Sequence, residues 1–293
     1  MSMSKKFEFK EVSPEYVSDY ENLERKYRVY STSARRLVEL ANIQETDVVI
    51  DLGCGTGISS QEIYQRIGSK GKLIGIDISP RMLDVAKRKF RGKDNVRFIV
   101  GDGYHLSDLV DEKVDVVLSN FTFYYFLSDL NSLFGQVYDV LKSNGRYVFN
   151  ITSYFTPLNF EGKEYNKFGY ILWNEADKVL KEHGYKGRGE YVFDLSLLDN
   201  CDRVKEILEK SGFSFVECKL SELPITPEQT LDFTYEGFFK YGSGTSFSST
   251  LRDIPFEERI EIIKEIIKRT KQRFKKEGIQ ETPKVFDILA VKS

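Results

Sequence analysis

The stretch Val48-Val-Ile-Asp-Leu-Gly-Cys-Gly-Thr-Gly57 decides the fold of this chain, because it joins a buried strand to a glycine-rich turn. Its first three residues are apolar and β-branched, as expected of a strand that is buried on both faces. Glycines after such a strand let the backbone turn sharply and let a ligand approach without meeting a Cβ atom. A helix is predicted from about Gly57 to Ile67, and its first turn offers unpaired amide donors. The sequence therefore predicts a ligand site between this strand and this helix.

Strands and helices are expected to alternate as far as residue 151. Short apolar runs predict the strands, and amphipathic segments between them predict the helices. Ser79-Pro80 suits the start of one helix, while Ser128 and Asn144-Gly145 suit the start and end of another. Strands joined in this way form a parallel, doubly wound α/β sheet with right-handed crossovers. The expected strands are 48–50, 72–76, 96–100, 114–118 and 147–151.

The whole chain, 1–293, is expected to form a single domain with a cap. Its length allows one large core, or one core and a sizeable cap. Residues 45–151 form the ligand-binding core in this prediction. The cap elements are the helical N-terminal segment 1–44, the aromatic and loop-rich segment 152–198, and the segment 221–284.

Two long helices are predicted within the cap elements. Residues 15–41 place Leu23 and a row of tyrosines on one face, with a break near Ser31. The tyrosines serve either packing or, at Tyr27 or Tyr30, contact with a ligand. The second helix runs from about Pro255 to Lys275 and is expected to bury Ile260, Ile263 and Ile267.

Composition excludes several classes of function. The formal net charge is -2, which argues against a duplex nucleic-acid partner, since such partners call for a basic face. The N-terminus has no apolar segment of the secretory type, and no apolar run is long enough to span a membrane. Cys54, Cys201 and Cys218 lie far apart, so we expect neither a disulfide framework nor a cysteine-bound zinc, and we expect a cytoplasmic location.

Three acids near strand ends indicate the kind of ligand. Asp77 ends the second strand, 20 residues after Gly57, where a carboxylate can accept hydrogen bonds from ribose hydroxyls. Asp102 ends the third strand at the same edge of the sheet. Asp51 comes directly before the glycines and would disfavour a pyrophosphate, and the loop reads G-x-G-x-G followed by Ile58 rather than G-x-G-x-x-G. These features favour a ligand with a ribose and a positively charged amino group.

Four segments in this order resemble the class I S-adenosylmethionine-dependent methyltransferases. Within that family the pattern is most similar to the small-molecule branch that includes ubiquinone and menaquinone methyltransferases. The resemblance implies a Rossmann-like, seven-stranded, mostly parallel sheet, with 213–220 and 285–291 as its last, antiparallel pair. It also implies S-adenosylmethionine as the cofactor. The matching segments are Val48 to Gly57, Gly75 to Met82, Val96 to Gly103 and Val114 to Asn120.

The resemblance implies roles for individual residues. Asp77 would hold the ribose hydroxyls, Ile78 and Met82 would flank the adenine, and Asp102 with the Gly103 amide would bind the exocyclic amine of adenine. The residues implied at the methionine end are Asp51 near its amino group, Gly53, Cys54 and Gly55 in the loop, with Cys54 as a small filler, and Asn120 and Phe121 beside the transferred methyl; Tyr30 is included as a further cofactor contact.

Methyl transfer is a direct displacement that needs a general base only when the acceptor must first lose a proton. The sequence shows no unambiguous base. The candidates are His105, which follows Asp102 closely, and Tyr124 and Tyr125, whose rings could also stabilise a sulfonium through cation–π attraction. Residues 120–123 read Asn-Phe-Thr-Phe, without the Asn-Pro-Pro-Tyr type of motif expected for methylation of a nucleobase amine.

Three functions are compatible with this pattern. The first is a methyltransferase acting on a small, partly apolar acceptor under an aromatic cap. The second is a protein or RNA methyltransferase that uses 221–284 for docking. The third is a regulator that binds S-adenosylmethionine without catalysis. The sequence does not identify the acceptor or the oligomeric state.

Overall fold

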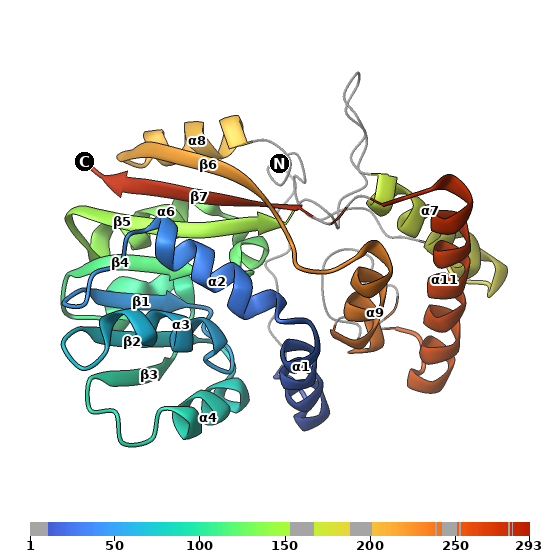
Figure 1. The fold of residues 1–293 in the computed structure, drawn as a ribbon, viewed down its shortest axis with the longest axis horizontal. Helices are drawn as coiled ribbons and strands as arrows, with labels where there is room; N and C mark the ends of the chain where they lie inside the picture. Colours follow the sequence, from blue (N-terminus) through green and yellow to red (C-terminus); the bar gives the residue numbers. More distant parts are fainter. Residues whose placement is uncertain are drawn as a thin grey trace.

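A single sheet organises the chain (Figure 1). The computed structural model describes residues 11–152, 167–187, 201–237, 239–241, 251, 253–280, 282 and 284–293. Seven strands occur in the order β3-β2-β1-β4-β5-β7-β6, and β7 runs antiparallel to both of its neighbours. The predicted Rossmann-like sheet with an antiparallel last strand is therefore confirmed. The strands are β1 Val48–Leu52, β2 Lys72–Asp77, β3 Val96–Val100, β4 Val114–Ser119, β5 Leu141–Thr152, β6 Phe213–Glu222 and β7 Lys284–Lys292.

The register brings the ends of the central strands to one edge. Leu52 of β1 lies beside Ile76 of β2, and Asp77 at the end of β2 lies beside Val100 of β3. On its other side β1 pairs with β4, so the strand order reverses between these two strands. Ligands of open α/β sheets bind outside the carboxyl ends of the strands at such a reversal.

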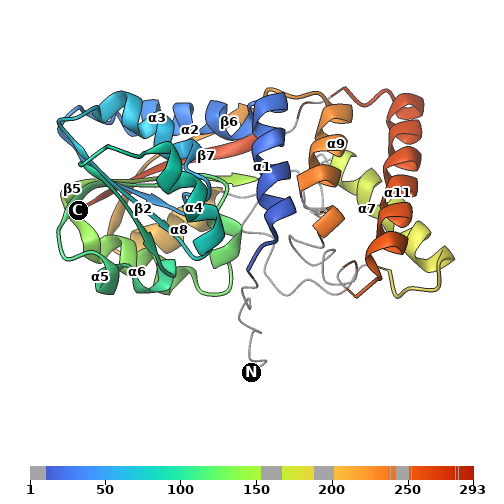
Figure 2. The same cartoon turned by 90° about the horizontal axis from the view of Figure 1, so that it is seen from below.

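Helices cover both faces of the sheet (Figure 2). Side chains alternate along each strand, so Val49 and Val116 pack under α2 and α3, whereas Ile50 and Val117 pack against α6 and α8. The Phe90 ring, at the end of α4, lies against Tyr64 of α3. The helices are α2 Val29–Leu40, α3 Ile58–Ile67, α4 Pro80–Lys89, α5 Leu106–Leu109, α6 Leu130–Val140 and α8 Cys201–Lys210.

The N-terminal helical segment divides earlier than predicted. Helix α1 covers Pro14–Tyr27, and α2 starts at Val29 after Arg28, whose φ of 53° is left-handed. The carboxylate of Glu24 accepts hydrogen bonds from the amides of Tyr30 (3.0 Å) and Ser31 (3.4 Å). This carboxylate satisfies amide donors in the first turn of α2, so the break lies at Arg28 rather than near Ser31.

The ends of α6 also differ from the prediction. Asp129 caps the helix by accepting a hydrogen bond from the Ser132 amide, whereas the Ser128 hydroxyl lies 3.1 Å from the hydroxyl of Tyr104. The helix ends at Val140 and β5 begins directly, so Asn144, with a φ of 59°, lies within that strand. The pairing of β5 with β4 shifts register there.

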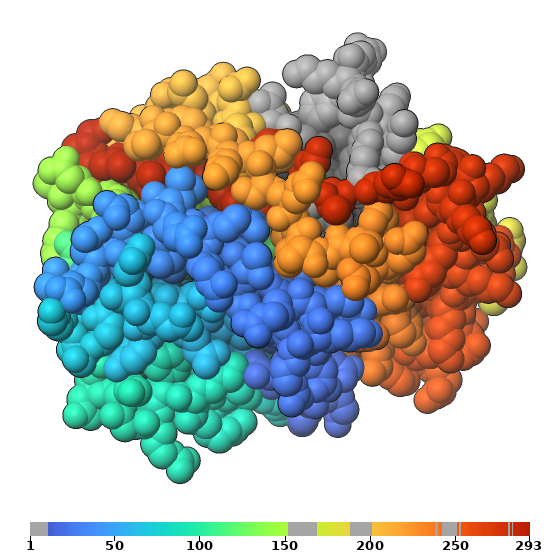
Figure 3. Space-filling view, in the orientation of Figure 1, coloured from blue at the N-terminus to red at the C-terminus, as the bar shows by residue number. Residues whose placement is uncertain are grey.

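Three cap helices, α7 Lys167–Glu182, α9 Pro227–Gly237 and α11 Phe256–Glu277, lie beyond the carboxyl edge. They share a buried cluster with Leu23 and Tyr27 of α1, and α1 lies between them and the sheet (Figures 2 and 3). Although α11 is 22 residues long, neither it nor any other helix within the described ranges is apolar enough to cross a membrane.

Two details of the cap correct the sequence prediction. Residues 167–182, expected to be loop-rich, are helical because Ile171, Leu172, Ala176, Val179 and Leu180 recur at helical spacing and are buried. In α11 the half-buried Ile260 lies at the margin of the buried face, because the face that meets α7 and α9 is rotated from the predicted one. The residues buried there are Ile262, Ile263, Ile266, Ile267, Thr270 and Phe274.

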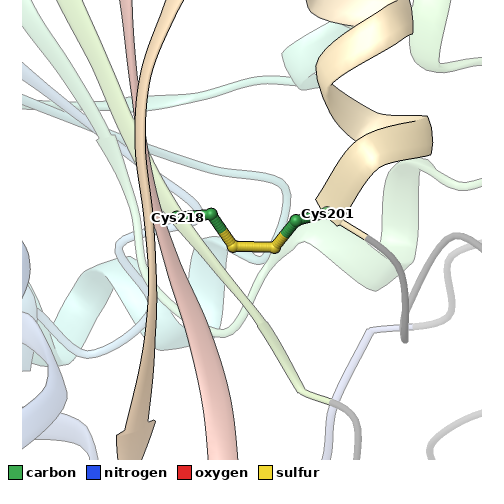
Figure 4. Close-up of a disulfide and its surroundings, with 2 residues drawn as sticks. All are labelled: Cys201 and Cys218. Atoms are coloured by element: carbon green, nitrogen blue, oxygen red, sulfur yellow. A yellow bond between two sulfur atoms is a disulfide. The ribbon is translucent and has the colours of Figure 1, made fainter.

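The cysteines also differ from the prediction, because Cys201 and Cys218 form a disulfide (Figure 4). Cys201 starts α8 and Cys218 lies in β6, so the reversal of the chain between this helix and strand brings together residues 17 apart in sequence. Neither residue belongs to a short cysteine motif, which is why the sequence did not indicate the pair. Cys54 is a free, buried thiol.

The disulfide should stabilise the folded chain measurably. Closing a loop of about 15 residues lowers the entropy of the unfolded chain by about 3 kcal/mol of free energy. We therefore expect Cys218→Ser to lower the melting temperature, and dithiothreitol to lower that of the wild type by a similar amount. The control is the variant itself, whose melting temperature dithiothreitol should leave unchanged. Mass spectrometry that found three free thiols before reduction would contradict the pairing.

Candidate functional site

The glycine loop after β1 has a backbone that only glycine adopts easily. Gly53, Gly55 and Gly57 all have left-handed φ values, between 52° and 82°. The Gly53 amide donates to the Ile76 carbonyl of β2 at 2.7 Å. A Cβ atom on Gly53 would lie 2.3 Å from the Thr122 side chain, whereas at Gly55 the nearest atom would be 3.4 Å away. The loop is therefore pressed against its neighbours at Gly53 and has room at Gly55.

Asp77 connects the glycine loop to the start of α4. One carboxylate oxygen accepts a hydrogen bond from the Gly55 amide at 2.8 Å, and the other accepts one from the Ser79 amide at 2.9 Å. Burial raises the pKa of Asp77, and these two amides oppose the increase. The Ser79 hydroxyl caps α4, as predicted, by accepting from the amide of the buried Met82.

Asp51 is buried beneath the loop at the end of β1. Its carboxylate accepts hydrogen bonds from the hydroxyls of Ser59 (2.7 Å) and Ser60 (2.6 Å) in the first turn of α3. Burial raises the pKa of Asp51 to about 6, although both hydroxyls favour the ionised form. The carboxyl group is therefore ionised at physiological pH against the cost of its burial.

The other predicted cofactor residues lie near the same edge. Asp102 accepts a hydrogen bond from the Tyr104 amide at 3.0 Å, and Gly103 is buried where a Cβ would meet the Phe126 ring. Ile78 is 39% exposed directly after Asp77. Cys54 is buried, and burial raises the pKa of its thiol, so it is a packed, neutral group.

The turn after β4 is fixed by a buried amide network. Phe121 has a φ of 55°, a strained value for a residue with a side chain. Its amide donates to Asn150 Oδ1 at 2.7 Å, and Asn150 Nδ2 donates to Asn120 Oδ1 at 2.8 Å and to Ser33 Oγ at 2.8 Å. Asn120 Nδ2 then donates to the Tyr30 carbonyl at 3.0 Å. The network joins β4, β5 and α2 at the candidate site.

Replacing Asn150 with leucine should cost about 2–4 kcal/mol of folding free energy, since each buried polar group left without a partner costs about 1–3 kcal/mol. The groups affected are the Phe121 amide and the Asn120 side chain. Urea unfolding monitored by circular dichroism would measure the loss. Ser33→Ala is the matched control, because it removes only the branch to α2 and should cost about 1 kcal/mol. An Asn150→Leu variant as stable as the wild type would contradict this role.

A tyrosine cluster, Tyr16, Tyr20, Tyr30, Tyr124 and Tyr125, lies over this turn and the loop. Tyr20 stacks on Tyr30 with ring centroids 4.5 Å apart, and the Tyr124 and Tyr125 centroids are 4.1 Å apart. Burial raises the pKa of Tyr124 well above its ordinary value, and the neighbouring phenols of Tyr125, Tyr16 and Tyr30 add to this increase. Burial also raises the pKa values of Tyr20 and Tyr125, so these three hydroxyls stay protonated at neutral pH.

The cluster also contacts the glycine loop and the turn. The Tyr30 ring meets Phe121 edge-on, with centroids 5.5 Å apart. The Tyr20 hydroxyl lies 3.9 Å from the position of a Cβ on Gly55. The Asp77 charge contributes to the raised pKa values of Tyr20 and Tyr125. The structure thus brings the cluster, Asp77 and the loop together.

His105 lies apart from these groups. Its side chain is 68% exposed, and its Nδ1 atom is 3.8 Å from the Asp108 carboxylate. Within the described residues, no contact joins His105 to the glycine loop or the tyrosine cluster. The structure therefore gives no support to His105 as a general base.

Sequence reasoning missed several residues that build the site: Ser59 and Ser60 under Asp51, Thr122 against Gly53, Tyr20 as a site residue, and Asn150. One signal was available for Asn150, because it is a polar residue in the otherwise apolar run Tyr147 to Ile151. A buried polar side chain in a central strand needs partners. The other four could not be distinguished from ordinary capping or packing residues.

Together, this strand order, the glycine loop and the acids that end β1 and β2 define a methyltransferase-type Rossmann-like domain. Residues 43–185 match the model of a family described as "Methyltransferase domain". These residues form a methyltransferase domain, and the chain is an S-adenosylmethionine-dependent methyltransferase.

Two curated relatives of this chain are also named as methyltransferases. A demethylmenaquinone methyltransferase of Lactobacillus johnsonii is 27% identical over 192 residues, which cover 62% of this chain and 74% of that one. A malonyl-[acyl-carrier protein] O-methyltransferase of Ilyobacter polytropus is 36% identical over 102 residues, 35% of this chain and 37% of that one. The match spans little more than a third of the second relative. The substrate in that relative's name therefore says nothing about the substrate of this chain.

A solved structure shows the same fold. It is the phosphoethanolamine N-methyltransferase 2 of Haemonchus contortus in complex with S-adenosyl-L-methionine. It has a TM-score of 0.54 and 16% sequence identity, and the match covers 100% of this chain and 60% of that one.

Proposed function

We propose that this chain transfers a methyl group from S-adenosylmethionine to a small, partly apolar acceptor by direct displacement. The observation that carries the proposal is the tyrosine cluster, which places aromatic faces over the glycine loop and beside Phe121. An aromatic surface of this kind suits an acceptor with apolar parts. The demethylmenaquinone methyltransferase relative is named for an acceptor of small-molecule size, which supports the same class.

The cofactor fits the residues at this edge. Asp77 would accept hydrogen bonds from the ribose hydroxyls, Ile78 and Met82 would lie beside the adenine, and Asp102 with Gly103 would lie at its exocyclic amine. The space at Gly55, where a Cβ would have no neighbour closer than 3.4 Å, lets the backbone approach the ligand. The residues proposed at the methionine end are Asp51, Gly53, Cys54, Gly55, Tyr30, Asn120 and Phe121.

The site's own residues would act mainly by positioning and by excluding water. When bound, the cofactor supplies an already activated methyl group on a sulfonium. The neutral Tyr124 and Tyr20 rings would favour positive charge near their faces. The amide network would hold Phe121 in place at the point of transfer. Since both tyrosines stay protonated at neutral pH, neither would act as a general base in its resting state.

A transfer assay with methyl-labelled S-adenosylmethionine tests the proposal. The acceptor panel should contain a demethylated quinone, a malonyl thioester, a small amine, unfolded protein and RNA. We expect label on a small acceptor and less than a tenth of that rate for Phe121→Gly, which removes the ring at the transfer point. Label on protein or RNA alone would favour the docking alternative, and cofactor binding with no acceptor labelled would favour a regulator. Either result would overturn the proposal.

The cellular location also remains a proposal. We propose a cytoplasmic location, which the small number of cysteines favours. The Cys201–Cys218 bond weighs against it, because such bonds are commoner in oxidising compartments, although intracellular proteins of hyperthermophiles also contain them.

A further inference from the structure

Strand β6 is an edge of the sheet, and its middle is unusually open. It lies last in the strand order, next to β7. Val216 is 53% exposed and Leu220 is 51% exposed, and both are among the most exposed large apolar side chains in the described residues. The strand is the uppermost strand of the sheet in Figure 1, with α8 drawn above it, and its orange atoms reach the visible surface in Figure 3. An open edge of this kind can accept another strand.

The charged residues of this segment share one face of the sheet. Side chains that lie opposite each other in an antiparallel pair point to the same face. Glu217 lies opposite Leu289, which packs in the core under α2 and α3. Lys219 lies opposite Asp287, which forms an ion pair with Arg36 of α2. Glu217 and Lys219 therefore both point to the α2 face.

Cys218 and Leu220 belong to the opposite face. Cys218 lies opposite Ile288 and Leu220 lies opposite Phe286, and all four take the side of α6 and α8. Val216 is the extra residue at a register shift between Phe215 and Glu217, which is the position of a β-bulge. In the segment 216–220, Cys218 therefore lies at the centre, an acidic and a basic residue flank it, and an apolar residue stands at each end.

We propose that β6 pairs antiparallel with β6 of a second copy of this chain, with Cys218 on the two-fold axis. A two-fold interface places the same surface patch of both copies together. In this register Glu217 lies opposite the partner's Lys219, and Val216 lies opposite the partner's Leu220. The Glu217–Lys219 contact and the Val216–Leu220 contact therefore each form twice, once on either side of the axis. The two seven-stranded sheets would join into one continuous sheet.

The charge pattern is what selects a second copy over other partners. A lysine and a bulge also occur on edge strands that stay unpaired, because both features discourage a neighbouring strand. Here, however, the lysine has an acid two residues away, on the same face and at the matching distance from Cys218. A one-residue slip in register would place residues of opposite faces together, and a two-residue slip would place Glu217 opposite Glu217 or Lys219 opposite Lys219, so both are unfavourable.

Sedimentation velocity of the full-length oxidised chain tests the proposal. We expect a dimer in the wild type at micromolar concentration and a shift to monomer in Glu217→Lys, where four lysines would face each other across the axis. The double variant Glu217→Lys with Lys219→Glu should restore the dimer, because it exchanges the two charges. Leu220→Asp should also weaken the dimer, by about tenfold or more in dissociation constant.

Asp84→Lys is the matched control, since it makes the same change of charge on the exposed face of α4, far from β6 along the sheet. It should leave the dimer intact. A wild type that stays monomeric up to the solubility limit would overturn the proposal, and so would a dimer that survives both Glu217→Lys and Leu220→Asp. The measurement needs no cofactor or acceptor, so its outcome is independent of the proposed function.

Discussion

Replacing Asp77 with alanine should weaken the binding of S-adenosylmethionine by about 100-fold or more. A hydrogen bond to a charged group contributes about 1.5–3 kcal/mol, and the proposed role gives Asp77 two of them, one to each ribose hydroxyl. The variant also loses the acceptor for the Gly55 amide, so the loop itself would be less well fixed. Isothermal titration calorimetry with S-adenosylmethionine measures the change directly.

Asp129→Ala is the matched control for this experiment. Asp129 is also an acid that accepts a hydrogen bond from a backbone amide, here that of Ser132, but it caps α6 outside the site. It should lose about 1 kcal/mol of stability and no cofactor affinity. Wild-type affinity in Asp77→Ala would refute the assignment of the ribose site. Asp77→Asn separates charge from shape, because one amide acceptor remains.

Asp51→Asn should stabilise the ligand-free protein at pH 7.5 and weaken its binding of the cofactor. The pKa of Asp51 rises from its ordinary value of 3.8 to about 6, and this increase corresponds to about 3 kcal/mol in favour of the neutral form. At pH 7.5 the native wild type carries the charge at that cost, and the asparagine variant does not. The positively charged amino group proposed beside Asp51 would lose its counter-charge in the variant.

The effect of Asp51 on the unfolding free energy depends on pH. Because the folded pKa of Asp51 lies above the unfolded value, its contribution to stability is complete below pH 3.8 and is lost as the pH rises through about 6. The difference in unfolding free energy between variant and wild type should therefore grow across that interval. Cofactor affinity of the wild type should increase over the same interval, and that of the variant should change less. Parallel stability curves for the two proteins would contradict the role of Asp51.

The cofactor half of the fold could be predicted because its signals are local. The β-branched run at Val48, the glycines after it and the Ser79-Pro80 helix start each act within a few residues of sequence, and the structure has the expected elements there. The acids at 51, 77 and 102 followed from the rule that strand ends meet at one edge. All three lie where that rule puts them.

The remaining features depend on partners far apart in sequence. The Phe121 amide donates a hydrogen bond to Asn150, 29 residues away, and the Thr122 hydroxyl donates one to the Gly53 carbonyl, 69 residues away. The helix break at Arg28 has no glycine in the sequence to indicate it, because the Glu24 carboxylate, six residues before Tyr30, supports the start of α2 instead. In α7 the aromatic residues between 152 and 198 suggested a loop-rich segment, although its aliphatic residues recur at helical spacing. These contacts are properties of the folded arrangement, and a single sequence does not display them.

The places where the cap joins the sheet have an evolutionary consequence. The chain enters the cap after β5, enters it again after β6, and returns from it at β7, and these three strands are neighbours at one end of the sheet. The glycine loop and Asp77 belong to β1 and β2 at the other end. Insertions, deletions or exchanges in the cap could therefore accumulate without disturbing the pairing of β1 with β2. A lineage built on this plan can change the molecule it modifies while it inherits an unaltered cofactor site.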